Sequence, residues 1–148
     1  MSNTISYFKG NYRWLSNFER CQIYYNGVMY QCVESAYQAQ KTVNEKVRWI
    51  FSNLDGREAK ALGQETHVRN DWEEVKLDVM HDLIWIKFNI PRFKQLLLAT
   101  GDMEIIEGNY WGDTFWGVYR GTGENHLGKI IMDIREEIVE ETKVKEDA

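Results

Sequence analysis

Two short runs of β-branched and aromatic residues, 21–25 and 28–32, are separated by the dipeptide Asn26-Gly27. Short runs of this composition are typical of β-strands. The pair Asn-Gly accepts the positive φ angles that a two-residue β-turn requires. The pattern therefore predicts a β-hairpin near the start of the chain.

The spacing of apolar residues then changes to intervals of three and four, which is the period of an α-helix. Asn44 and Asp55 are suited to cap helices that begin directly after them, and Pro91 is suited to a first helical turn. The apolar stripe is clearest in the segment that begins at Asp71, which predicts a long amphipathic helix with one buried face. Six segments are predicted to be helical: residues 33–43, 45–53, 56–64, 71–88, 91–99 and 125–141.

Glycine and tryptophan gather in residues 108–124, which predicts an ordered loop where the backbone turns sharply or approaches a ligand. Residues 105–107 suit a short strand before this loop, and the charged residues 142–148 are expected to fray. Together the elements predict an α+β, predominantly helical fold. We expect a single compact domain, with its core over about residues 7–138 and a charged tail over 139–148.

Composition limits the functions that this fold can serve. The chain has 148 residues and a net charge of −5, which argues against broad affinity for nucleic acid, because such affinity needs many cationic groups. Aromatic residues make up 14% of the chain, which is compatible with a pocket that stacks a planar ring. The three histidines, His67, His81 and His126, lack the spacing of a metal site. Cys21 and Cys32 are expected to be reduced packing residues, and without a secretory signal or a membrane span we expect a soluble, cytoplasmic protein.

Candidate chemistry is concentrated at Glu34 and Lys41, which stand seven positions apart in a segment without Pro or Gly. Seven positions are about two helical turns, so Glu34, Gln38 and Lys41 are predicted to line one face of a helix. This face would present a carboxylate, an amide and an amine together. A solvated surface ion pair is the alternative interpretation of the same spacing.

A series of short motifs follows one order along the chain. They are Leu15-Ser16-Asn17-Phe18, the segment from Glu34 to Lys41, Asn70-Asp71-Trp72, Lys87-Phe88, Leu97-Leu98 before Thr100-Gly101, Trp111-Gly112-Asp113, Gly123-Glu124-Asn125-His126-Leu127-Gly128 and Met132-Asp133-Ile134-Arg135. This order, over about residues 7–138, resembles the NADAR, or YbiA-like, domain family. The resemblance implies an intracellular N-glycosidase with an α+β, mostly helical fold and with neither metal nor cofactor. One branch of the family is similar to enzymes that cleave early phosphoribosylated pyrimidine intermediates of riboflavin biosynthesis, and another removes ADP-ribose from modified guanine bases.

The resemblance also implies roles for particular residues. Glu34 corresponds to the catalytic carboxylate, Lys41 to the amine of the same site and Asp113 to a second acid. It further implies Asn17, Phe18 and Asn125 as pocket lining and Trp72 as a stacking or positioning residue. Residue chemistry, and not the resemblance, adds Trp116 as a second candidate for stacking on the leaving base. It also adds three candidate phosphate ligands that stand next to motif residues: Arg13, Arg69 and Arg120. Ordinary structural roles remain open for several of them: Trp72 also suits a core, Asp113 a turn, and the arginines a solvated surface.

The chemistry of the predicted reaction explains why these residue types suit it. Breaking the C1–N bond of a ribose builds positive charge on the sugar while the departing nitrogen gains electrons. The site therefore needs an acid near the nitrogen and a carboxylate or base near C1, and Glu34 and Asp113 suit these two places. Once the sugar ring opens, Lys41 can form a Schiff base at C1, or it can instead stabilise the sugar oxygens.

We therefore predict an N-glycosidase that releases ribose 5-phosphate from a phosphoribosylated aminopyrimidine. One alternative is a hydrolase of ADP-ribosylated guanine in DNA or nucleotides, which uses the same residues. The other is a non-catalytic module that binds ADP-ribose or a phosphorylated ribose. No membrane partner is expected in any of these cases.

Overall fold

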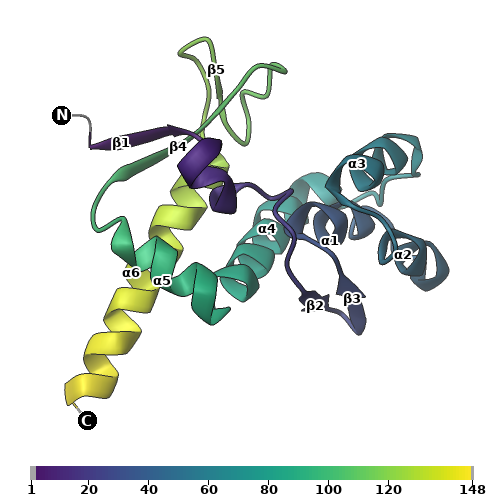
Figure 1. Cartoon of the computed structure of the whole chain (residues 1–148). Coiled ribbons are helices and arrows are strands. Elements are labelled where there is room, and N and C mark those ends of the chain that lie inside the picture. Colours follow the sequence, from purple (N-terminus) through teal and green to yellow (C-terminus); the bar gives the residue numbers. More distant parts are fainter. Residues whose placement is uncertain (1–2, 148) are drawn as a thin grey trace. The chain divides into compact units, whose positions relative to one another are not determined.

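The computed structural model describes residues 3–147 and confirms the predicted α+β, predominantly helical fold (Figure 1). The elements are, in order, β1 (Thr4–Tyr7), the 3-10 helix η1 (Gly10–Leu15), β2 (Ile23–Tyr25), β3 (Val28–Tyr30), α1 (Val33–Ala39), α2 (Glu45–Phe51), α3 (Gly56–Glu65), α4 (Trp72–Phe88), α5 (Pro91–Ala99), β4 (Glu104–Asn109), β5 (Val118–Tyr119) and α6 (His126–Asp147). The strands form a three-stranded sheet and a separate two-stranded hairpin.

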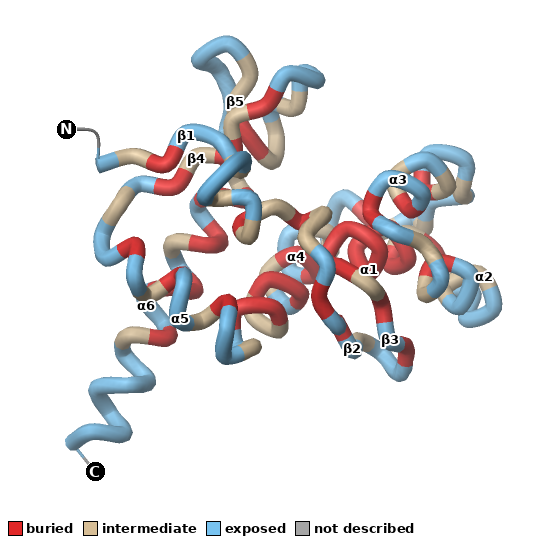
Figure 2. Tube along the Cα trace, viewed as in Figure 1, coloured by how far each residue is buried: buried red, intermediate tan, exposed pale blue. Residues whose placement is uncertain are grey.

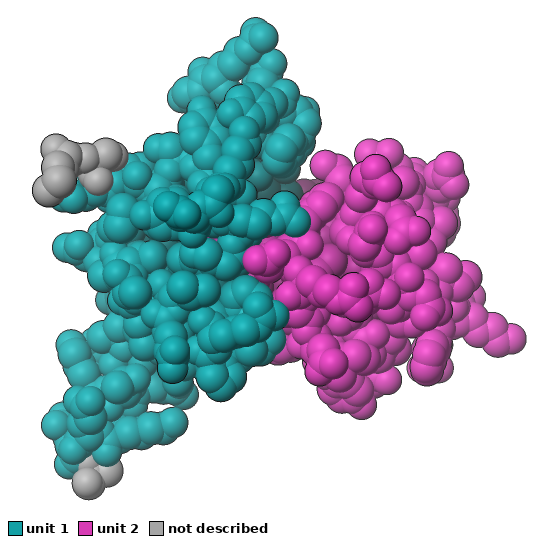
Figure 3. All heavy atoms as spheres, in the orientation of Figure 1, with its two compact units in different colours: residues 1–14, 88–148 teal, residues 15–87 magenta. Residues whose placement is uncertain are grey.

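The described residues form two compact units (Figure 3). Unit 1 comprises residues 3–14 and 88–147, and unit 2 comprises residues 15–87. Buried apolar side chains occur in both units, and in unit 2 the whole of α1 is buried (Figure 2).

The hairpin of unit 2 forms as predicted. Tyr25 pairs with Val28 beside the turn, and Asn26 and Gly27 have φ angles of 50° and 84°. Asn and Gly are the residues that adopt such angles at least cost. The Tyr25 hydroxyl donates a hydrogen bond of 2.7 Å to the carboxylate of Asp82, which ties the hairpin to α4.

The N-termini of α2 and α3 also agree with the sequence prediction. The Asn44 side chain accepts hydrogen bonds from the N–H groups of Lys46 and Val47, at 3.0 and 3.2 Å. The Asp55 carboxylate accepts from the N–H of Glu58 at 2.8 Å, and the Glu58 carboxylate accepts from the N–H of Asp55 at 3.0 Å. This reciprocal pair is a capping box, which satisfies N–H groups that lack partners within the helix.

α1 is shorter than predicted, because it ends at Ala39 and not at residue 43. The N–H groups of Lys41 and Thr42 bond to carbonyl oxygens three residues back, which is the tighter 3-10 geometry. The Thr42 hydroxyl then accepts a hydrogen bond of 3.1 Å from the N–H of Asn44, the N-cap residue of α2. The capping of α2 thus begins where α1 was predicted to continue. The prediction that Lys41 and Glu34 share one helical face is therefore wrong.

Unit 1 is built on a parallel sheet in the order β1-β4-β5. The strand predicted at residues 105–107 is longer, and its partners β1 and β5 were not predicted. In the β1–β4 pair, Ile5 lies opposite Ile105, and both side chains are buried. A Cβ atom at Gly108 would lie 2.3 Å from the carbonyl oxygen of Ser6, so glycine is needed for β1 to approach β4 this closely.

α6 packs against β4 and continues to Asp147, beyond the predicted end at residue 141. Its buried face includes Ile131, Ile134 and Ile138, as the apolar spacing predicts. Residues 142–147 are helical and exposed, and their expected fraying stays a prediction. Ala148 lies outside the described residues.

Cys21 and Cys32 are both buried, in agreement with their prediction as packing residues, and their reduced state stays a prediction. Over residues 3–147, no helix combines the length and the apolar character that crossing a bilayer requires. Within the same range, no three or more His, Cys, Asp or Glu side chains are grouped in a way that suits a metal ion.

The capping box predicts the effect of Asp55→Ala. Loss of this N-cap should lower the free energy of unfolding by about 0.5–2 kcal/mol, because the N–H of Glu58 loses its partner. Urea unfolding followed by circular dichroism measures the change. Asn53→Ala, an exposed substitution two residues earlier, is the control and should leave the midpoint unchanged. Equal midpoints for both variants would contradict the role of the cap.

Candidate active site

Glu34 lies in the first turn of α1, and its side chain is only 8% exposed. Its backbone N–H donates a hydrogen bond of 3.0 Å to the carbonyl oxygen of Asn17. The side-chain amide of Gln38, one turn later, donates a hydrogen bond of 2.8 Å to Oε1 of Glu34. A carboxylate at the start of a helix is also stabilised by the helix dipole. Glu34 is therefore a buried acid in a fixed orientation, so the surface ion pair that the spacing left open does not describe it.

The segment that precedes the hairpin is held against Glu34 by residues of unit 2. The Lys87 ammonium group, near the end of α4, is fully buried and donates a hydrogen bond of 2.8 Å to the carbonyl oxygen of Ser16. The Asn17 amide donates at 3.6 Å to the sulfur of Met80. Oδ1 of Asn17 is buried and has no hydrogen-bond partner among the described residues. The structure thus brings the predicted residue Asn17 next to Glu34.

Phe18 lies in the same segment and packs against the start of α3. A Cβ atom at Gly56 would lie 2.9 Å from the Phe18 ring, so the absence of a side chain there makes room for the aromatic ring. The Phe18 N–H donates a hydrogen bond of 3.1 Å to the hydroxyl of Ser16. Phe18 is half-buried, which is compatible with its predicted place in a pocket wall.

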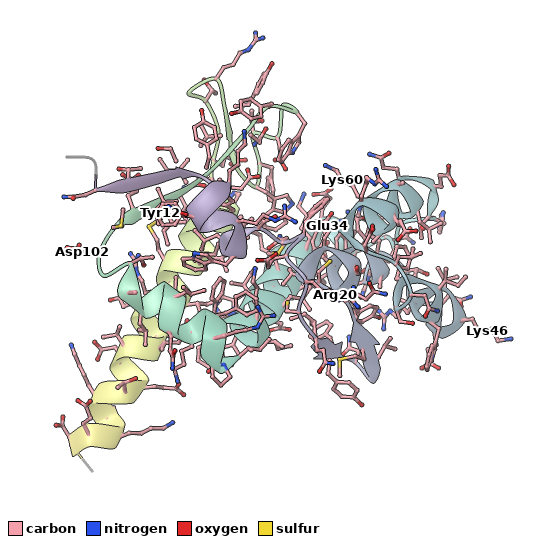
Figure 4. The ribbon with its side chains drawn as sticks, viewed as in Figure 1. Tyr12, Arg20, Glu34, Lys46, Lys60 and Asp102 are labelled. Atoms are coloured by element: carbon pink, nitrogen blue, oxygen red, sulfur yellow. The ribbon has the colours of Figure 1, made fainter. Side chains whose placement is uncertain are left out.

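Lys41 lies two residues after α1 and remains within electrostatic reach of Glu34. Burial lowers the pKa of Lys41 from 10.5, because the charged ammonium form loses hydration. The Glu34 carboxylate raises this pKa, while the positive charges of Lys60 on α3 and Lys76 on α4 lower it. The net shift is downward, so more of the Lys41 amine is neutral near pH 7 than for an ordinary lysine. Figure 4 labels Glu34 and Lys60 in this unit.

Two other predicted residues of unit 2 already have partners in the structure. Trp72 is buried, and its ring lies 5.1 Å from that of Tyr37 on α1. The Arg69 guanidinium donates two hydrogen bonds to the Asp71 carboxylate, at 2.6 and 2.9 Å. Trp72 therefore supports the helix that carries Glu34, and Arg69 would have to exchange or share its carboxylate to bind a phosphate.

Asp113 lies in the loop between β4 and β5 in unit 1. Its Oδ1 accepts hydrogen bonds from the N–H groups of Phe115 and Trp116, at 3.0 and 2.8 Å. The Trp116 ring packs edge-on against Phe115, with 4.9 Å between centroids. The carboxylate thus stabilises the turn, which is the structural role that the sequence left open for Asp113. Its role as a second acid and the stacking role of Trp116 stay predictions.

Asn125 joins the start of α6 to β4. Its Oδ1 accepts from the N–H of Glu107 at 2.9 Å, and its amide group donates to the carbonyl oxygen of Ile105 at 3.0 Å. It adopts a positive φ angle of 54°, which Asn tolerates better than most residues. Both ends of this side chain are therefore occupied by backbone, and its predicted contact with substrate stays a prediction.

The two remaining arginines belong to unit 1 and are exposed. Arg13 lies on η1, and Arg120 has a φ angle of 50° in a turn after β5. The Arg120 guanidinium lies 5.1 Å from the centre of the Tyr119 ring, a cation–π contact that leaves it at the surface. Their predicted role as phosphate ligands is compatible with this exposure.

One buried acid was not among the sequence predictions. Glu107 on β4 is 9% exposed, and its Oε2 accepts a hydrogen bond of 3.0 Å from the Asn109 amide. A Cβ atom at Gly117 would lie 1.7 Å from the same oxygen. The signal for this residue was alternation, because Ile105, Glu107 and Asn109 are the inward positions of β4. The strand was predicted only over residues 105–107, which is too short to show this alternation.

Comparison with known proteins finds relatives that match most of this chain. The chain is 37% identical over 135 residues to an N-glycosidase of Nostoc punctiforme, covering 86% of each protein. It is 32% identical over 149 residues to N-glycosidase YbiA of Escherichia coli, covering 93% of this chain and 91% of the relative. A riboflavin biosynthesis protein of Vibrio vulnificus is 37% identical over 136 residues, and the match spans 88% of this chain but only 36% of that longer protein.

The fold and the sequence lead to the same class. The NMR structure of Escherichia coli YbiA matches with a TM-score of 0.84 and 31% identity, covering 96% of this chain and 89% of that chain. The buried carboxylate of Glu34 thus stands in the fold of an enzyme class whose members of similar length are N-glycosidases, and the chain is an enzyme of this class. It belongs to the NADAR domain family, whose sequence profile matches residues 6–139.

The electrostatic link between Glu34 and Lys41 predicts how the lysine titrates. Glu34→Gln should lower the pKa of Lys41 further, because a neutral amide no longer stabilises the ammonium form. NMR titration of ¹³C-methylated lysines measures this, with the resonance assigned by its loss in Lys41→Arg. Glu65→Gln removes the same charge from the exposed end of α3 and serves as the control. A Lys41 pKa that rises in Glu34→Gln would show that the two groups do not interact as described.

Proposed function

We propose that this enzyme hydrolyses the N-glycosidic bond of a phosphoribosylated aminopyrimidine, an early intermediate of riboflavin biosynthesis, and releases ribose 5-phosphate. The observation that carries the proposal is the buried Glu34 carboxylate, bonded to Gln38 and electrostatically coupled to Lys41. The name of the Vibrio vulnificus relative, a riboflavin biosynthesis protein, supports this substrate class.

Glu34 is proposed to handle the proton and to polarise the sugar. As the C1–N bond lengthens, positive charge grows on the ribose, and a nearby carboxylate stabilises it. In its protonated form the same group can donate to the departing nitrogen, whose electron pair then holds that proton. Because Glu34 is buried, water screens its charge less, which strengthens its electrostatic effect on the positive charge of the ribose.

Lys41 is proposed to act at C1 of the opened sugar. Its neutral amine attacks C1 of the ring-opened glycosylamine, the C1–N bond to the pyrimidine breaks, and the pyrimidine leaves as the free amine. Water then hydrolyses the resulting Schiff base, which restores the lysine and yields ribose 5-phosphate. Overall one water is consumed and no oxidant or reductant is needed. The downward shift of the Lys41 pKa supports this role, because only the neutral amine is nucleophilic.

One assay tests the function. The protein is incubated separately with the phosphoribosylated aminopyrimidine and with an oligonucleotide that carries ADP-ribosylated guanosine, and the released sugar is identified by mass spectrometry. We expect free ribose 5-phosphate from the first. Free ADP-ribose from the second alone would instead identify a guanine hydrolase, and binding without either product would identify a non-catalytic module. Both outcomes would overturn the proposal.

Glu34→Gln should reduce turnover of the aminopyrimidine substrate by at least about a hundredfold, because general acid–base help contributes roughly 10²–10⁴-fold. Gln keeps the size of the side chain, so the far-ultraviolet circular dichroism spectrum should not change. Glu65→Gln provides the matched control for loss of one exposed carboxylate. Turnover near that of the unchanged protein would remove Glu34 from the mechanism.

Borohydride reduction tests the role of Lys41. If the Schiff base forms, reduction during turnover should attach the sugar phosphate to Lys41, and peptide mass spectrometry should locate the adduct. Lys41→Arg keeps the positive charge but cannot form the imine, so it should give no adduct. An unmodified Lys41 in an active enzyme would favour the electrostatic role over the covalent one.

A further inference from the structure

Gln38 lies between the proposed catalytic carboxylate and α3. Its side chain is 5% exposed, and its Nε2 donates the 2.8 Å hydrogen bond to Oε1 of Glu34. A hydrogen bond to a buried carboxylate is strong and directional, so it restricts rotation of the carboxylate plane. The orientation of Glu34 therefore depends on where the Gln38 amide is held.

The other end of the Gln38 amide packs directly on α3 at Gly63. A Cβ atom at Gly63 would lie 1.9 Å from Oε1 of Gln38 and 2.8 Å from its amide carbon. Both distances are shorter than real Cβ contacts, and both atoms belong to the amide group that binds Glu34. Any larger residue at Gly63 would therefore displace the amide from its present position.

Two features of the contact between Gln38 and Gly63 lower the stability of the fold. Oε1 of Gln38 is buried and, among the described residues, has no hydrogen-bond partner. Gly63 stands inside α3, where glycine is a poorer helix former than alanine. An apolar side chain facing an alanine would avoid both costs. What the present pair provides is one N–H group aimed at Glu34.

We propose that Gln38 is a positioning residue that holds the Glu34 carboxylate for the reaction, and that Gly63 is the specific partner that keeps the Gln38 amide in place. The inference rests on the catalytic role proposed for Glu34. Gln38 touches Glu34 and acts through it. Gly63 acts one step further away, through the position of the amide.

A double-mutant cycle tests this connection. Gln38→Ala and Gly63→Ala should each lower kcat by about tenfold to a hundredfold with little change in KM, since each removes one charge-assisted hydrogen bond. In the double variant, Gly63→Ala should cause no further loss beyond that of Gln38→Ala, because the group that it displaces is gone. Losses that multiply would show that Gly63 acts independently and would overturn the proposal.

Two further variants separate positioning from folding. Gln38→Met keeps the volume but lacks the N–H donor, so kcat should fall while the free energy of unfolding stays equal or rises. A large loss of stability with unchanged kcat in the remaining folded protein would point to a purely structural role and would overturn the proposal. Gln64→Ala places the same alanine one position along α3 on its exposed face and should leave kcat unchanged.

An NMR measurement tests the contact without any substrate. The side-chain NH₂ resonances of Gln38, identified by their loss in Gln38→Ala, should shift as Glu34 is titrated, and this pH dependence should vanish in Glu34→Gln. Gly63→Ala should displace the same resonances. If the unchanged protein turns over no aminopyrimidine but these shifts occur, the proposed substrate is wrong while the contact stands. Resonances that do not respond to Glu34 would overturn the positioning role itself.

Discussion

The hydrogen bond from the buried Lys87 side chain to the carbonyl oxygen of Ser16 is the interaction on which the arrangement of unit 2 depends. A buried polar group lowers stability unless polar partners compensate it, and the carbonyl oxygen of Ser16 supplies one partner for Lys87 at 2.8 Å. The next carbonyl, that of Asn17, receives the N–H of Glu34. The end of α4 therefore holds Ser16 and Asn17 in place, and Asn17 in turn holds the first turn of α1. Glu34 owes its position to a residue far away in the sequence.

Local signals in the sequence were sufficient wherever a short stretch determines its own geometry. Asn26-Gly27 predicted the hairpin because its positive φ angles need no distant partner. Asn44 and Asp55 predicted helix starts because their side chains bond within three residues. β1 carried no such signal. Its four residues form a strand only because β4, far along the chain, offers a parallel edge and a glycine that admits it.

The candidate site shows the same division. Glu34 was predictable from its motif, but its spacing to Lys41 also suited a surface ion pair, so its burial is seen only in the folded chain. The position of Lys41 was not, because α1 ends at Ala39, and the Thr42 hydroxyl that follows accepts a hydrogen bond from the N–H of Asn44, the N-cap of α2. The electrostatic coupling of Lys41 to Glu34 survives this change because it depends on distance through space. Gln38 stood on the predicted stripe, but its partner Gly63 belongs to α3 and only the folded chain reveals the contact.

The parallel pairing of β1 with β4 also imposes an order on folding. Unit 2 is continuous over residues 15–87, so all of its partners are present once that stretch has been synthesised. Unit 1 is discontinuous, and Thr4–Tyr7 must wait for Glu104–Asn109 before its backbone groups are paired. Contacts between distant segments form slowly because a long loop must close first. During synthesis at the ribosome, the half that carries Glu34 and Lys41 is thus complete while the first strand of the chain is still an unpaired edge.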